Sequence, residues 1–180
     1  MIKPASLVDA RFGELFQTER SAVRHCAVEA DRLGQTLPGL ALRAVSSHAK
    51  RAEADLERHA TRRGIELMSV GKIVGALLSN FRDYVTDFTL TSEESYRATL
   101  LGMRHGCDVV ALVGAAARIE GDVALATWCA EWLAERCPLV ERCADALSWF
   151  ASYPELALCN AKTTPALAHG RAQQGAHTSA

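Results

Sequence analysis

The feature that most constrains this chain is a helical spacing of apolar residues that recurs along most of its length. In successive stretches, apolar residues return every three or four positions, which places them on one face of an α-helix. No stretch sustains strand-like alternation between hairpin turns. The sequence therefore predicts an all-α protein.

Glycine and proline residues divide this pattern into helices. The first two predicted helices cover residues 6–33 and about 40–63, and they end before Gly34 and Gly64. A turn at Pro38 separates them. The residues expected to face inward are Phe12, Phe16, Val23, Cys26, Ala30, Leu42, Val45, Ala49, Ala52, Leu56 and Ala60.

The middle of the chain predicts two more helices. A shorter connecting helix is expected within residues 69–88, and a long one follows it and ends at Gly121. The long helix opens with a capping-box pattern, Thr91 followed three residues later by Glu94. The residues of this long helix that are expected to share an inner face are Tyr96, Leu100, Met103, Cys107, Val110 and Gly114.

The last predicted helix has Asp122 as its N-cap and runs to about Ala151. Pro138 lies inside it and predicts a kink near Ala134, because proline removes a backbone donor and clashes one turn back. Its expected inner face comprises Leu125, Trp128, Trp132, Leu139, Cys143, Ala146 and Phe150.

Together these elements predict an antiparallel four-helix bundle with one extra connecting helix. Residues 1–153 would form the bundle domain. Residues 154–180 are small and polar, and they predict a flexible C-terminal tail because they offer little apolar surface to offset ordering entropy.

Charge and hydropathy limit the classes of partner. The chain has 20 basic and 21 acidic residues, so no strong field would draw it to nucleic acid or to an anionic membrane. Charged residues interrupt every candidate membrane span, and the first residues lack the pattern of a signal peptide. We expect a cytoplasmic protein that binds neither nucleic acid nor membrane.

The six cysteines are scattered and contain no Cys-x-x-Cys pair, so we expect free thiols. Cys137 is predicted to point outward and is the thiol to test for reactivity. Tyr96, Trp128 and Trp132 are interpreted as core aromatic residues and not as electron-transfer groups.

Two acidic residues fall within the apolar stripes. Glu19 lies among the inward residues of the first helix, and Glu135 lies close to Trp128 and Leu139 on the last. An unpaired carboxylate is costly to bury, so each predicts an internal partner. For Glu19 that partner is either a metal ion or an arginine from a neighbouring helix.

The stretch HAKRAEADLERH, residues 48–59, places His48, Asp55 and His59 in a narrow sector of the second helix. With Glu19 and Glu135 they suggest a metal shell of Glu19, Asp55, His59 and Glu135, with His48 in reserve. Such oxygen and imidazole ligands suit iron, manganese or zinc. The competing interpretation is the solvated margin of an ordinary amphipathic helix.

The order of elements resembles the ferritin-like superfamily, and most closely a stress-associated bacterial branch of it. The features that carry the resemblance are Glu19, the LPGL turn, HAKRAEADLERH, EESYRATLLGMRHG with Tyr96, and WLAERCPLVERC with Glu135. The resemblance spans about residues 6–150 and implies a helical bundle that binds iron or manganese and acts in redox chemistry or stress response.

The sequence departs from that family where the metal ligands would be. Di-iron members carry Glu-x-x-His motifs, and this chain has none. Arg51 precedes Asp55 where a ligating Glu would be wanted, and Arg136 follows Glu135 where a second acid often lies. An arginine here would replace the charge of a metal, and could pair with Glu19 or Glu135.

Two hypotheses follow from these departures. The first is a non-catalytic bundle with an eroded metal site and no cofactor. It would act as a structural or protein-interaction module and form a homo-oligomer, expected to be a dimer through an apolar helix face. The second is an iron- or manganese-binding redox or stress-response protein of the same fold. No phosphate-binding loop, nucleophile elbow or zinc-type Cys/His spacing supports another enzyme class.

Overall fold

The computed structural model describes residues 6–67 and 90–162, and every regular element in those ranges is a helix. The predicted all-α class is therefore confirmed. The helices in chain order are α1 (Leu7–Leu33), α2 (Leu37–Arg63), α4 (Ser92–Glu120), α5 (Val123–Asp145), α6 (Leu147–Ser152) and α7 (Pro154–Leu158).

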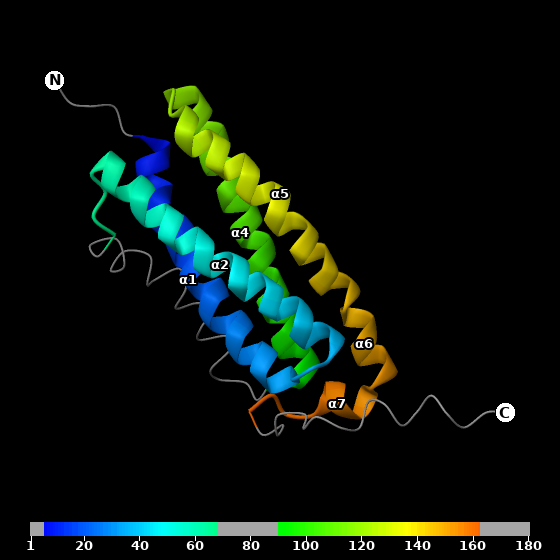
Figure 1. Ribbon diagram of the computed structural model, residues 1–180. Helices are drawn as coiled ribbons and strands as arrows, with labels where there is room; N and C mark the ends of the chain where they lie inside the picture. The colour runs from blue at the N-terminus through cyan, green and yellow to red at the C-terminus, as the bar shows by residue number, and fades with distance from the viewer. Residues whose placement is uncertain (1–5, 68–89, 163–180) are drawn as a thin grey trace.

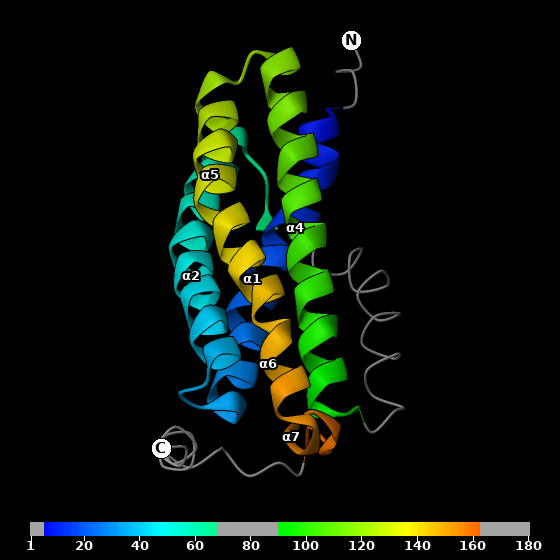
Figure 2. The same cartoon turned by 90° about the vertical axis from the view of Figure 1, so that its right-hand side faces the viewer.

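The four long helices lie side by side, and each packs against two neighbours (Figures 1 and 2). Helix α1 contacts α2 and α4, while α5 contacts α4 and α2. The start of α1, the end of α2, the end of α4 and the start of α5 meet at one end of the molecule (Figure 1). Helices α2 and α4 therefore run in the same direction, and every pair in direct contact is antiparallel.

Most predicted helix ends agree with the structure. Ser6 caps α1, the capping box of Thr91 and Glu94 opens α4, and Asp122 caps α5. Helix α2 begins three residues before the predicted Leu40 because Thr36 caps it. Proline is tolerated in the first helical turn, where backbone N–H groups have no partner within the helix, so Pro38 does not delay the start.

Gly39 is required by the tight connection between α1 and α2. A Cβ atom at this position would lie 2.4 Å from the carbonyl oxygen of Gly34. A larger residue would therefore push the two helices apart at this end.

The C-terminal part differs from the prediction in two places. Helix α5 continues through Pro138 but ends at Asp145, and the break at Ala146 separates α6 from it. Part of the expected flexible tail is also ordered, because α7 packs on α4 and the amide of Ser92 donates to the carbonyl of Cys159 at 2.7 Å. The kink near Ala134 stays a prediction.

Two other expectations concern residues that the structure does not describe. The connecting helix predicted within 69–88 lies outside the described residues, as does the rest of the expected tail, 163–180. Of the described helices, α4 has the length and the apolar composition needed to cross a membrane. Half of its most apolar 18-residue stretch is buried inside the molecule. A core helix of a soluble protein has the same properties.

The apolar core has two clusters, one toward each end of the molecule. The first includes Phe12, Leu56, Val110 and Trp132, and the second includes Cys26, Leu42, Tyr96 and Phe150. Between them along α1, α2 and α5 lie Glu19, His48 and Arg136, each of which is almost fully buried. We call these three residues the polar layer.

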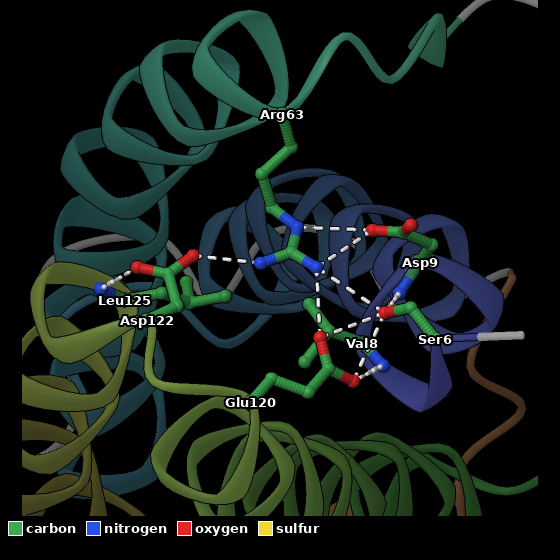
Figure 3. Close-up of polar contacts among 7 residues, drawn as sticks. All are labelled: Ser6, Val8, Asp9, Arg63, Glu120, Asp122 and Leu125. Atoms are coloured by element: carbon green, nitrogen blue, oxygen red, sulfur yellow. Dashed lines mark hydrogen bonds and ion pairs between the residues drawn. The ribbon is translucent and has the colours of Figure 1, made fainter. Parts of the chain in front are cut away.

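One end of the molecule is held together by Arg63, the last residue of α2 (Figure 3). Its guanidinium donates to Asp9 at 2.9 Å, to Asp122 at 2.7 Å and to Glu120 at 3.0 Å. These carboxylates belong to the start of α1, the N-cap of α5 and the end of α4, so a single side chain connects four helix ends. They hold the pKa of Arg63 above its ordinary value, against the effect of its partial burial.

Candidate functional site

The polar layer is the most unusual feature of the described interior. Arg136 is 1% exposed and is the largest of the fully buried side chains. Its Nη2 donates to Glu19 Oε2 at 2.7 Å, and its Nε donates to His48 Nδ1 at 3.0 Å. The guanidinium also lies over the ring of Trp132, 4.5 Å from the ring centroid. Three helices thus converge on one buried cation.

Each member of the layer is positioned by helical spacing. Glu19 follows Phe12 and Phe16 on the buried face of α1, and Arg136 lies one turn after Trp132 on α5. His48 lies between Val45 and Ala52 on the buried face of α2. All three face inward because they lie on the apolar faces of their helices. The opposite charges of Glu19 and Arg136, and the hydrogen bonds among the three residues, make that burial tolerable.

Glu19 is a strongly desolvated carboxylate. Burial raises the pKa of Glu19, and the neighbouring Arg136 opposes that shift. Its second oxygen, Oε1, makes no well-formed hydrogen bond with the described residues, although the indole of Trp132 also acts to lower the pKa of Glu19. The carboxylate is therefore balanced in charge by Arg136 but not fully satisfied in hydrogen bonds.

His48 connects the layer to the surface. Burial and the adjacent Arg136 lower the pKa of His48 to about 4, so the imidazole is neutral at neutral pH. Because Nδ1 accepts from Arg136, the proton of the neutral ring is on Nε2, which lies 3.5 Å from Glu135 Oε2. A polar chain thus runs from exposed Glu135 through His48 and Arg136 to buried Glu19.

A small surface pocket of about 90 Å³ opens between α2 and α5 beside His48. Its lining residues are His48, Arg51, Ala52, Asp55, Trp128, Glu131, Trp132 and Glu135. Arg51 donates to Glu135 Oε2 at 3.1 Å across the pocket, and both side chains are largely exposed. The pocket therefore carries both signs of charge and is open to solvent.

Three of the four residues predicted as a metal shell lie in these two places, and His59 lies in neither. His48, Asp55 and Glu135 line the pocket, whereas Glu19 lies in the polar layer. Asp55 pairs with Arg58 and accepts from Trp128 Nε1 at 3.2 Å. The ring of His59 packs against that of Trp128, with 5.7 Å between centroids. Glu19 and His48 are therefore connected through Arg136, and Asp55 is hydrogen-bonded to Trp128.

This arrangement does not fit the di-metal centre of a ferritin-like protein. Within residues 6–67 and 90–162, no three or more His, Cys, Asp or Glu side chains are grouped so that they could hold a metal ion. A cation beside Glu19 would meet the guanidinium of Arg136, and Glu135 and Asp55 are already paired with Arg51 and Arg58. Of the two partners proposed for Arg136 from the sequence, the structure selects Glu19.

Two polar residues were not predicted from the sequence: Glu29 in the interior and Glu131 in the pocket. Glu29 is buried, accepts from Ser95 Oγ at 2.8 Å and pairs with Arg32, which joins the end of α1 to the start of α4. Because Glu29 lies three residues after the inward-facing Cys26, helical spacing could have predicted that it is buried. Glu131 lines the pocket one turn before Glu135, and nothing in the sequence distinguished it from a solvated helix residue.

The described residues define an all-helical protein with a buried Glu–Arg–His layer across its middle. No protein-family model matches the chain, and neither does any curated protein or any solved structure with which it was compared. What the layer does must therefore be inferred from its geometry.

Proposed function

We propose that the chain is an antiparallel four-helix bundle of ferritin-like type in which an arginine replaces the metal centre. In this proposal it acts as a non-catalytic structural or protein-interaction module. The observation that carries the proposal is Arg136, a buried guanidinium hydrogen-bonded to Glu19 and His48 at mid-length between the two apolar clusters.

The directions of the helices support the ferritin-like topology. Helices α2 and α4 are consecutive among the described long helices, yet both run toward the end of the molecule held by Arg63. A bundle with one long crossover between its second and third long helices has this arrangement, and ferritin-like folds have one such crossover.

The charge of Arg136 supports the loss of metal chemistry. In a di-metal bundle the cations balance inward carboxylates, and here the guanidinium balances the one carboxylate of the layer, Glu19. Unlike a metal ion, a guanidinium has no open coordination position and no redox chemistry. The layer therefore connects three helices and offers no reactive centre.

An exposed apolar stripe on α4 supports a role in self-association. Leu101, Leu112 and Ile119 are 57%, 45% and 88% exposed, and their spacing of eleven and seven residues places them on one face of the helix. A second copy laid antiparallel on this stripe would bring Leu101 of one chain opposite Ile119 of the other. The proposed assembly is a homodimer through this face.

Elemental analysis tests the metal part of the proposal. The chain is expressed in medium supplemented with iron and manganese and purified without chelator. Bound metal is measured by inductively coupled plasma mass spectrometry. We expect far less than one iron or manganese per chain. Stoichiometric metal that disappears in the Glu19→Ala variant, with helicity retained, would establish the alternative instead.

That alternative is an iron- or manganese-binding redox or stress-response protein of the same fold. The observation in its favour is that His48, Asp55 and Glu135 line one pocket, and it requires these side chains to move closer together to hold a metal ion.

Sedimentation velocity tests the association part. We expect Leu112→Glu to shift the chain from dimer to monomer, while Leu40→Glu leaves the dimer intact. Leu40 is a matched control because it is 47% exposed but lies on α2, away from the stripe. A monomeric wild-type chain, or equal behaviour of the two variants, would contradict association through this face.

A further inference from the structure

The contact between α4 and α5 brings two half-buried cysteines to the same level of the molecule. A Cβ atom at Gly114 would lie 2.8 Å from the Cβ atom of Cys129, so the two helices approach closely there. Because the two helices are antiparallel, a residue two turns back along α4 and a residue two turns forward along α5 are again at the same height along the bundle. These steps lead from Gly114 to Cys107, and from Cys129 to Arg136 and its neighbour Cys137.

Both thiols lie on the sides of the helices that face each other. Cys107 shares the face of Gly114 on α4 and packs against both apolar clusters, which places it level with the polar layer. Cys129, Leu133 and Cys137 are spaced four residues apart and follow one edge of α5. The Cys137 thiol is near enough to raise the pKa of Cys107, and both residues are partly accessible to solvent.

We propose that Cys107 and Cys137 are a redox site, which a hydroperoxide oxidises to a reversible disulfide that cross-links α4 to α5. All six cysteines are free thiols in the structure, so this is the reduced form. Cys26 and Cys143 also lie near each other, but both are fully buried, so a peroxide in solvent does not reach them. Cys26, Cys129 and Cys143 are almost fully buried, and Cys159 is exposed and donates to the carbonyl of Glu155.

The two thiols have different roles in the oxidation. Burial and the neighbouring Cys137 raise the pKa of Cys107 to about 12, so Cys107 keeps its proton at neutral pH. The thiolate is the nucleophile toward a peroxide. Cys137 is therefore the attacking thiol, and Cys107 is the resolving thiol.

The reaction consumes one hydrogen peroxide. The Cys137 thiolate attacks one peroxide oxygen, the O–O bond breaks, and the departing hydroxide takes up the former thiol proton as water, which leaves a sulfenic acid on Cys137. The sulfur of Cys107 then attacks the sulfenic sulfur, the S–O bond breaks, and the hydroxyl group leaves as a second water with the proton of Cys107. Two thiols lose two electrons, and a dithiol such as dithiothreitol returns them by exchange.

The helix around Cys137 is suited to the small adjustment that a disulfide requires. Pro138 follows it directly and has no backbone N–H, so the carbonyl of Ala134 lacks its usual helical hydrogen bond. The backbone of α5 therefore has one constraint fewer where the Cys137 side chain must turn toward Cys107.

The experiment uses the full chain with Cys159→Ser, which removes the exposed thiol that would otherwise link two molecules. The chain is titrated with hydrogen peroxide, remaining thiols are alkylated under denaturing conditions, and intact mass and peptide mapping are recorded. We expect the loss of two of the five remaining thiols, a cross-linked peptide pair that contains Cys107 and Cys137, and full recovery of both thiols with dithiothreitol.

Variants separate this site from general oxidation. In Cys107→Ser we expect no disulfide and a dimedone adduct on Cys137, whereas Cys129→Ala, as a control, should form the Cys107–Cys137 disulfide as before. Cys137→Ala should also abolish the disulfide, so the result does not depend on one variant folding. Retention of all thiols at peroxide concentrations that oxidise free cysteine, or a cross-link between any other pair, would overturn the proposal.

Discussion

Arg136 shows how strongly a single residue can depend on its partners. Its side chain and that of Glu19 are each 1% exposed, so neither charge can be solvated if the other is removed. Buried ion pairs of this kind stabilise little compared with apolar residues, but breaking one is expensive because it leaves an uncompensated charge. Replacing all three residues of the polar layer with apolar residues should therefore lower the stability less than replacing one of its two charged residues.

We expect Arg136→Met to lower the free energy of unfolding by about 3–5 kcal/mol, because Glu19 loses its counter-charge. The measurement is urea denaturation followed by circular dichroism at neutral pH. The matched control is Arg51→Met, since Arg51 makes an exposed pair with Glu135, and exposed pairs contribute roughly 0–1 kcal/mol. Equal losses in the two variants would contradict the assignment of Arg136 to a desolvated pair.

The lowered pKa of His48 predicts a pH dependence of stability. The folded imidazole has a pKa of about 4, whereas the ordinary pKa of a histidine is 6.5. As the pH falls from about 6.5 to 4, the unfolded chain therefore binds a proton that the folded chain does not, and the folded state loses stability. Above this window the contribution of His48 is fully present.

His48→Gln isolates that contribution. Between pH 7 and pH 4 we expect the wild type to lose about 1–3 kcal/mol more stability than His48→Gln, since one pKa unit corresponds to about 1.4 kcal/mol. Urea unfolding at a series of pH values measures the difference. Parallel pH profiles for the two proteins would show that His48 titrates with an ordinary pKa.

At the scale of the helix, the contact between α4 and α5 depends on a glycine. Gly114 lets α4 approach Cys129, and a Cβ atom at this position would be too close for ordinary packing. Gly102 lies on the same helix, and a Cβ atom there would meet nothing within 4 Å. The same substitution at these two positions should therefore have opposite effects.

We expect Gly114→Ala to destabilise the protein by about 1–3 kcal/mol, because overpacking outweighs the better helix propensity of alanine. Gly102→Ala should instead stabilise it by about 0.5–1 kcal/mol, since only propensity changes there. Thermal unfolding of both variants measures the effects. Stabilisation by both substitutions would mean that α4 and α5 are less closely packed than the structure shows.

At the scale of the whole molecule, the polar layer separates two apolar clusters and connects α1, α2 and α5 at mid-length. The second polar network, around Arg63, holds four helix ends together (Figure 3). The interior is therefore apolar, polar and apolar in turn along the helix axes. This alternation opposes sliding of one helix along another, because a shifted helix would leave Arg136 or Glu19 among apolar side chains.

The combined variant Glu19→Leu, His48→Leu, Arg136→Met tests what the layer contributes. We expect it to be as stable as the wild type or more stable by about 1–4 kcal/mol, because apolar packing replaces a desolvated charge pair. Urea denaturation measures this, and the dispersion of amide NMR signals reports whether one packing is retained. Lower stability than the wild type would show that the layer itself stabilises the fold.

The sequence by itself determined the four long helices and most of their inner faces, although Glu135, which was predicted within an inner stripe, is exposed. Ser6, Thr91 and Asp122 supply caps through hydrogen bonds within a few residues of the chain, and residues such as Leu42, Leu56 and Tyr96 are buried as their spacing predicts. Local interactions were decisive there, so local patterns were sufficient. The break at Ala146 and the order of residues 154–162 were not visible, since contacts of α7 with α4 stabilise that segment.

The tertiary structure alone decided how the inward charges are paired. The sequence placed Glu19, His48 and Arg136 near the right faces but left open whether Arg136 would meet Glu19 or Glu135. It also grouped Asp55, His59 and Glu135 with Glu19 as metal ligands. Those choices depend on the relative heights and rotations of helices far apart in the chain. Side-chain packing across the whole core sets these positions, and spacing along one helix carries no record of them.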